Sequence, residues 1–259
     1  MEATVEQKVE STAALQILDG DDGKRRFEVA PFVFDPGATF LVQSMWLTGI
    51  GCPTNAKTFD GTMTGSFTDS ACPSGDRRDR QNEGLLLVKT GPTTNFAAAG
   101  AELNGVKGIM LTELGYDIRK LASTASPTGS HCGAGAPRFN VTTMDDVTHF
   151  VGCNSPAPLQ TASLTGWIRL RWDAPLLLAA FPPILPTDVV KAIDIIFDEG
   201  QDTGPDFFGA AIIDNIDVNG VLVGQGPEDE RAREDDRGRG DDRSRGDDRG
   251  RGDGRDREN

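Results

Sequence analysis

Oxygen-bearing side chains are concentrated in a short loop between residues 198 and 206. The loop holds four carboxylates, one amide and two glycines, and it stands directly before the last strand pattern of the chain. Ca²⁺ binds six to eight oxygen atoms, and glycine lets a loop bend around such an ion. The spacing differs from that of an EF-hand, so a solvated acidic turn is the alternative. The predicted calcium ligands are Asp198, Asp202, Asp206 and, from the following strand, Asp214.

Asp214 is predicted to be buried. Alternation along residues 212–218 places it on one strand face with Ile212, Ile216 and Val218. An isolated buried carboxylate is unfavourable, so Asp214 must accept hydrogen bonds, pair with a cation or bind a metal ion.

A second candidate site lies on the strand pattern of residues 166–172. Alternation places Trp167, Arg169 and Arg171 on one face and the apolar residues between them on the core face. A flat indole ring beside guanidinium donors suits a sugar, so these three residues are the predicted ligand-binding platform. The alternative is structural: the arginines pair with acidic groups of the same protein.

An enzyme needs a catalytic constellation, and the sequence contains only parts of one. Two carboxylates about 5–9 Å apart can hydrolyse a glycosidic bond, and Asp198 or Glu199 would serve in that alternative. The Gly-x-Ser-x-Gly pattern of serine hydrolases is absent around Ser130. Two histidines do not support a histidine-rich metal centre. We therefore predict no catalytic residue and favour a protein that is not an enzyme.

The four cysteines form two local pairs, Cys52 with Cys72 and Cys132 with Cys153. Neither pair has the CxxC spacing of zinc ribbons or redox motifs. Each disulfide would close a loop of about 20 residues and stabilise the fold by roughly 3 kcal/mol. Four cysteines allow three connectivities, and four free thiols are the alternative. Disulfides predict a secreted or periplasmic protein, although residues 1–18 show no signal-peptide pattern.

Short strands are the elements expected to position these residues. The 31 glycines and 15 prolines interrupt the chain at short intervals, and no long segment keeps helical spacing. Asn219-Gly220 predicts a two-residue type I′ turn between the last two strands. Residues 95–103 are expected to form one or two helical turns. The predicted strands are 27–34, 39–48, 59–68, 85–90, 109–116, 138–142, 148–152, 166–172, 190–197, 211–218 and 221–223.

Charge divides the chain into two parts. The formal net charge is −14, of which the segment 227–259 carries −3 and the preceding body −11. Residues 235–252 repeat an Asp/Arg/Gly-rich hexad without any apolar residue, which predicts a disordered tail.

The acidic body excludes nucleic acid and anionic membranes as partners, because both attract positive surfaces. No apolar run reaches the ~20 residues of a membrane-spanning helix.

The strand pattern Ile213-Asp214-Asn215-Ile216-Asp217-Val218-Asn219-Gly220 resembles the last strand of jelly-roll carbohydrate-binding modules. That resemblance implies a structural Ca²⁺ bound by Asp214. The stretch from about Trp46 to Gly224 also resembles a group of uncharacterised secreted bacterial proteins. The shared blocks are residues 115–119, 130–139 and 197–200.

We therefore predict an all-β protein, a two-sheet antiparallel sandwich of jelly-roll type over residues 25–226. An arm or short helix (1–24) precedes it, and the disordered tail (227–259) follows. The predicted function is a secreted, non-catalytic carbohydrate-binding or adhesion module, whose partner is a polysaccharide or a cell-surface component. An extracellular hydrolase acting on a polysaccharide and a structural surface protein are the alternatives.

Overall fold

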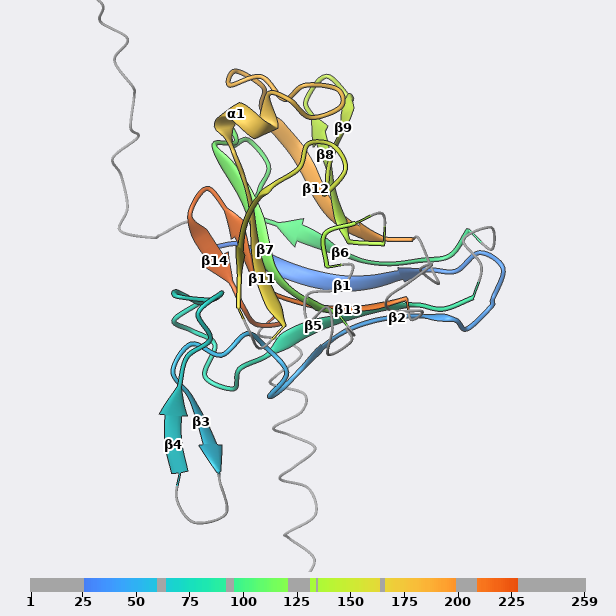
Figure 1. Cartoon of the computed structure of the whole chain (residues 1–259). Coiled ribbons are helices and arrows are strands. Elements are labelled where there is room, and N and C mark those ends of the chain that lie inside the picture. Colours follow the sequence, from blue (N-terminus) through green and yellow to red (C-terminus); the bar gives the residue numbers. More distant parts are fainter. Residues whose placement is uncertain are drawn as a thin grey trace, which may run out of the picture.

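The computed structural model describes residues 26–59, 64–91, 96–120, 131–133, 135–163, 166–198 and 209–227. These residues form two antiparallel β-sheets packed face to face and a separate hairpin (Figure 1). The predicted all-β sandwich is thus confirmed. The N-terminal arm and the disordered tail predicted from the sequence lie outside the described residues. No helical segment in the described ranges has the length and apolarity needed to cross a bilayer.

The first sheet has five strands, all paired antiparallel. Its order is β1 (Glu28–Phe34), β6 (Ala98–Asn104), β12 (Val190–Phe197), β8 (Arg138–Thr143) and β9 (Thr148–Val151).

The second sheet is larger and contains the strands that carry most of the predicted site residues. Its order is β10 (Leu159–Ala162), β11 (Trp167–Asp173), β7 (Glu113–Lys120), β13 (Ala210–Val218), β5 (Gly84–Lys89) and β2 (Val42–Leu47), and β14 (Val221–Val223) pairs with β13. The short helix α1 (Ala174–Leu177) follows β11, with Asp173 as its N-cap.

Local predictions have mixed outcomes. Asn219 and Gly220 both have positive φ, 55° and 79°, and they join β13 to β14 as expected.

The single strand expected over 59–68 is wrong: β3 (Ala56–Phe59) pairs with β4 (Thr64–Phe67) in a hairpin that projects from the sandwich (Figure 1). The helical turns expected over 95–103 are also wrong. Most of this segment is β6, because pairing with β1 and β12 on both sides overrides its local propensity.

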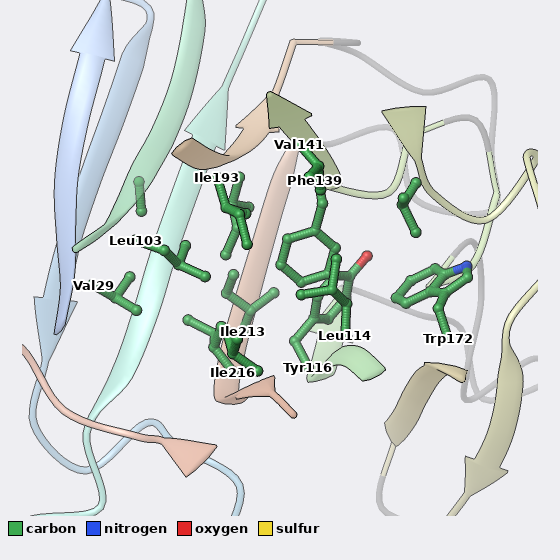
Figure 2. Close-up of a cluster of buried hydrophobic side chains, with 14 of the residues drawn as sticks. Val29, Leu103, Leu114, Tyr116, Phe139, Val141, Trp172, Ile193, Ile213 and Ile216 are labelled. Carbon is green, nitrogen blue, oxygen red and sulfur yellow. The ribbon is translucent and has the colours of Figure 1, made fainter. Parts of the chain in front are cut away.

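The core fills the space between the two sheets (Figure 2). Tyr116, Phe139 and Trp172 pack with ring centroids 5.6 to 5.9 Å apart. The Tyr116 hydroxyl donates a hydrogen bond to the Pro137 carbonyl at 2.6 Å, and the Trp172 indole donates one to the Pro156 carbonyl at 2.8 Å. The polar ends of the Tyr116 and Trp172 rings therefore have partners, which lets both rings be buried beside Phe139.

Both predicted disulfides, Cys52–Cys72 and Cys132–Cys153, are formed, with Cα–Cα distances of 6.2 and 5.2 Å. The predicted connectivity is confirmed, and the four-thiol alternative is not. The first disulfide ties together the irregular segments that lead into and out of the β3–β4 hairpin.

Candidate functional site

The expected exposed platform on β11 is wrong. Trp167 is 2% exposed and packs against Cys52, Ala71 and Cys72, which lie in the irregular segments on either side of the β3–β4 hairpin. These segments cover part of the outer face of the seven-stranded sheet. The strand alternation predicted the two faces of β11 correctly, but the face opposite the core is covered rather than open.

The two arginines of β11 form ion pairs with acids of neighbouring strands. Arg169 donates two hydrogen bonds to Asp117, at 2.7 and 2.9 Å, and Arg171 lies 3.1 Å from Asp217 and 3.5 Å from Glu113. The side chains of both arginines are only 11–12% exposed, and that of Asp117 is 0% exposed. The structural alternative considered for these arginines is therefore observed.

Asp214 is buried as predicted, but not among the core residues expected. The register of β13 against β7 shifts between Asp214 and Asp217, where Asn215 has a positive φ of 46°. This bulge sends Ile216 and Val218 into the sandwich core and leaves Asp214 under the covering segments. Its carboxylate accepts hydrogen bonds from the backbone N–H groups of Cys52 at 2.7 Å and Asn215 at 2.5 Å.

The described residues do not bring the predicted calcium ligands together. Asp198 follows β12 of the other sheet, where Arg138 donates hydrogen bonds to both carboxylate oxygens at 2.6 and 2.8 Å. Asp202 and Asp206 lie outside the described residues. Burial raises the pKa of Asp214, and repulsion from Asp117 and Asp79 adds to this effect. The acids that act on Asp214 are therefore Asp117 and Asp79, and not Asp198.

Asp79 makes stability depend on pH. Burial, together with repulsion from Glu83 and Asp76, raises its pKa from 3.8 to about 6. The folded state therefore binds more protons than the unfolded state between about pH 4 and 6, so the contribution of Asp79 to stability falls as the pH rises through this range. We expect Asp79→Asn to remove this part of the slope in urea unfolding from pH 4 to 7. An equal slope in the variant would contradict the assignment, and Asp146→Asn, at an exposed position, is the control.

A site that sequence reasoning missed lies on the outer face of the five-stranded sheet. A cavity of about 550 Å³ is walled by Phe32, Phe34 and Phe96, and Asn140 and Asp198 also line it. This volume lies within the 300–1,000 Å³ that small-molecule sites commonly have. Phe34 and Phe96 are 55% and 76% exposed, so these aromatic rings are accessible to a ligand.

Strand pairing positions the cavity. Phe32 lies opposite Gly100 and Phe34 opposite Ala98, so small residues of β6 lie beside the aromatic rings of β1. A Cβ atom on Gly100 would lie 2.6 Å from the Phe32 ring, and this close approach requires glycine. Phe96 belongs to the segment directly before β6. Phenylalanines from two segments thus surround small residues.

Polar groups complete the cavity. The Asn140 Oδ1 atom is buried and has no hydrogen-bond partner among the described residues. The Arg138 guanidinium, paired with Asp198, also lies 6.0 Å from the centroid of the Phe150 ring. Aromatic rings beside a few polar side chains suit a ligand that has apolar C–H faces.

Two carboxylates continue the same sheet face beyond the cavity. Asp194 lies opposite both Glu102 and Asn140 in the strand registers. Burial raises the pKa of Asp194, and repulsion from Glu102 adds to this effect. Like charges on adjacent strands repel, so this part of the face disfavours an anionic ligand.

Strand alternation in the sequence also indicates the outer face of the five-stranded sheet. Alternation along 27–34 and 138–142 places Phe32 and Phe34, and then Arg138 and Asn140, on surfaces opposite the core. Our sequence interpretation sought sugar platforms among the few tryptophans and the single tyrosine, whereas the chain has 13 phenylalanines. The phenylalanines therefore indicate the aromatic site better than the tryptophans do.

The fold and site together define a two-sheet β-sandwich with an aromatic cavity on one outer sheet face. No family model and no curated protein matches the sequence. Among solved structures, a family 11 carbohydrate-binding module from Clostridium thermocellum, in complex with a mixed-linked tetrasaccharide, is similar at 12% identity and a TM-score of 0.34. The similarity covers 78% of this chain and 94% of the module.

Two further solved structures are similar at the same level. A family 11 module of a cellulosomal cellulase of C. thermocellum has 11% identity and a TM-score of 0.30, covering 80% of this chain and 94% of the module. The enzymatically active domain of a tailspike protein of bacteriophage CBA120 has 10% identity and a TM-score of 0.33, covering 76% of this chain and 19% of that one. Similarity this low does not support an assignment of function.

Proposed function

We propose that this protein binds a polysaccharide without transforming it, in the cavity formed by Phe32, Phe34 and Phe96. The single observation that carries the proposal is an accessible cavity of about 550 Å³ walled by three phenylalanines, which Asn140 also lines. A sugar ring has apolar C–H faces that pack on phenylalanine side chains.

Charge specifies the class of polysaccharide. Glu102 and Asp194 extend the face beyond the cavity, whereas Asp198 is neutralised by Arg138. A polymer of uronic acids would bring carboxylates towards these acids, and a neutral polymer would not. We therefore expect neutral glycans to bind and uronic-acid polymers to be rejected.

A binding panel tests the proposal. The full-length protein is titrated by calorimetry with neutral β-glucan, xylan and mannan oligosaccharides and with oligogalacturonate. We expect saturable binding to at least one neutral oligosaccharide and none to oligogalacturonate at low ionic strength. Absence of binding across the panel would reject the sugar assignment. Tight oligogalacturonate binding would reject the charge argument alone.

The alternative of a hydrolase gains no support from Asp198. Its carboxylate is held by two hydrogen bonds from Arg138, and Glu199 lies outside the described residues. The same panel, read for new reducing ends, tests this alternative directly. A protein that neither binds nor cleaves any member would fit the structural alternative.

Secretion is part of the proposal. Two disulfides form within the described residues. Such bonds persist mainly in oxidising compartments, where a protein that binds polysaccharide would also meet its ligand. This agreement supports an extracellular or periplasmic location.

Calcium at Asp214 is the remaining proposal from the sequence. What supports it is that Asp214 is buried and is repelled by the Asp117 and Asp79 carboxylates, a cost that a cation bound to Asp214 would reduce. At about 100-fold excess over Kd, a bound ion would raise the Tm by roughly 5–10 °C for a domain of this size. We expect EDTA to remove this stabilisation in a thermal melt, and Asp214→Asn to abolish the difference. An unchanged Tm in EDTA would contradict calcium binding.

A further inference from the structure

One carboxylate lies beside the Cys52–Cys72 disulfide. The Sγ atoms of Cys52 and Cys72 and a carboxylate oxygen of Asp69 all lie within 4.8 Å of one another. The three residues are 1%, 0% and 3% exposed. In the described part of the chain, this is the one group of histidine, cysteine and acidic side chains close enough to share a metal ion.

Asp69 is held firmly in this position. Its Oδ1 atom accepts a hydrogen bond from the Ala71 N–H at 2.8 Å, and its own N–H donates to the Pro53 carbonyl at 2.9 Å. The Cys72 N–H donates to the Asp69 carbonyl at 3.1 Å. The Oδ2 atom is buried and has no hydrogen-bond partner among the described residues. A buried oxygen without a partner is uncommon and points to a proton or a cation that it would bind.

We propose that Cys52, Asp69 and Cys72 form a redox-controlled site for a borderline-soft divalent metal such as Zn²⁺. A dithiol reductant transfers two electrons and two protons to the disulfide, which gives two thiols, and the dithiol itself becomes a disulfide. Metal binding then releases both thiol protons, and the thiolates and the Asp69 carboxylate become ligands. Sulfur and carboxylate ligands suit Zn²⁺, whereas Ca²⁺ takes oxygen ligands only.

The oxidised and metal-bound states exclude each other. In the disulfide, the two sulfur atoms are bonded to each other, and neither is a thiolate. The Cys132–Cys153 disulfide is an internal comparison, because no acid or histidine forms a comparable group with it among the described residues. Reduction therefore creates one metal site and one pair of thiols without a carboxylate beside them.

The test uses the full-length protein, reduced with a phosphine, and Zn²⁺ or Co²⁺ as the probe. We expect one metal ion per chain, bound only after reduction, with sulfur-to-cobalt charge-transfer absorption. Zn²⁺ should slow alkylation of Cys52 and Cys72 relative to the metal-free reduced protein, as mapped by mass spectrometry. Alkylation of Cys132 and Cys153 should be unaffected.

Variants distinguish the contribution of the Asp69 carboxylate to Zn²⁺ binding from that of the two thiols. Asp69→Asn is expected to weaken Zn²⁺ binding by roughly tenfold or more, since even outer-shell partners of metal ligands contribute that much. Asp145→Asn, at an exposed position, should bind as the wild type does. Wild-type affinity in Asp69→Asn, or equal protection of both cysteine pairs, would overturn the proposal. If Asp69→Asn does not fold, the wild-type alkylation map decides alone, and absence of protection there refutes the site.

Discussion

Replacing both Phe34 and Phe96 by alanine is expected to weaken binding of the best neutral oligosaccharide by about 2–4 kcal/mol, or roughly 30- to 700-fold in Kd. The two rings are 55% and 76% exposed and form walls of the cavity. Their removal takes away the apolar surface on which a sugar ring packs. Calorimetry with the oligosaccharide identified by the panel measures the change.

Stability should be nearly unchanged in this double variant, because both side chains are exposed. Phe67→Ala is the matched control: this phenylalanine is 41% exposed on the β3–β4 hairpin and does not line the cavity. Trp167→Ala should lower the Tm without a specific effect on binding, since Trp167 is buried against the Cys52–Cys72 disulfide. Full affinity in Phe34→Ala/Phe96→Ala would place the sugar site elsewhere.

Asp117→Ala is expected to lower the free energy of unfolding by about 3–5 kcal/mol. Asp117 is fully buried and accepts two hydrogen bonds from Arg169, and Asn215 donates a third at 2.8 Å. Its removal leaves the Arg169 guanidinium mostly buried without its carboxylate. Urea unfolding with both disulfides intact measures this loss.

An exposed ion pair is the control for Asp117. Glu28 lies 3.9 Å from Arg26, and both side chains are 43% exposed. Glu28→Ala should therefore change the free energy of unfolding by less than about 1 kcal/mol. A loss equally small for Asp117→Ala would indicate that water replaces the missing carboxylate, and that the network contributes little.

Strand alternation predicted well wherever the strands are regular. It assigned Leu170 to the core and Arg169 to the opposite face of β11. Spacing in the sequence also favoured the two disulfide pairs that form, although it left three connectivities open. These features depend on local periodicity or on short loops, which a single sequence contains.

Two features depended on contacts that no local pattern encodes. The bulge at Asn215 arises from the pairing of β13 with β7, two strands almost 100 residues apart in the sequence, and it changes which residues accompany Asp214. The covering of Trp167 depends on irregular segments without periodicity, held down by bonds such as Cys52 N–H to Asp214. The cavity likewise joins Phe96, from outside any strand, to residues of β1 and β8.

The three tryptophans stand in three different environments. Trp172 belongs to the aromatic core, Trp167 lies beneath the disulfide-bonded segments, and the Trp46 indole on β2 donates to the Val29 carbonyl of β1, in the other sheet, at 3.0 Å. Variants that keep one tryptophan each would therefore report separately on the sandwich interior, its covering layer and the contact between the sheets. Fluorescence can thus reveal whether the covering layer detaches before the sandwich unfolds.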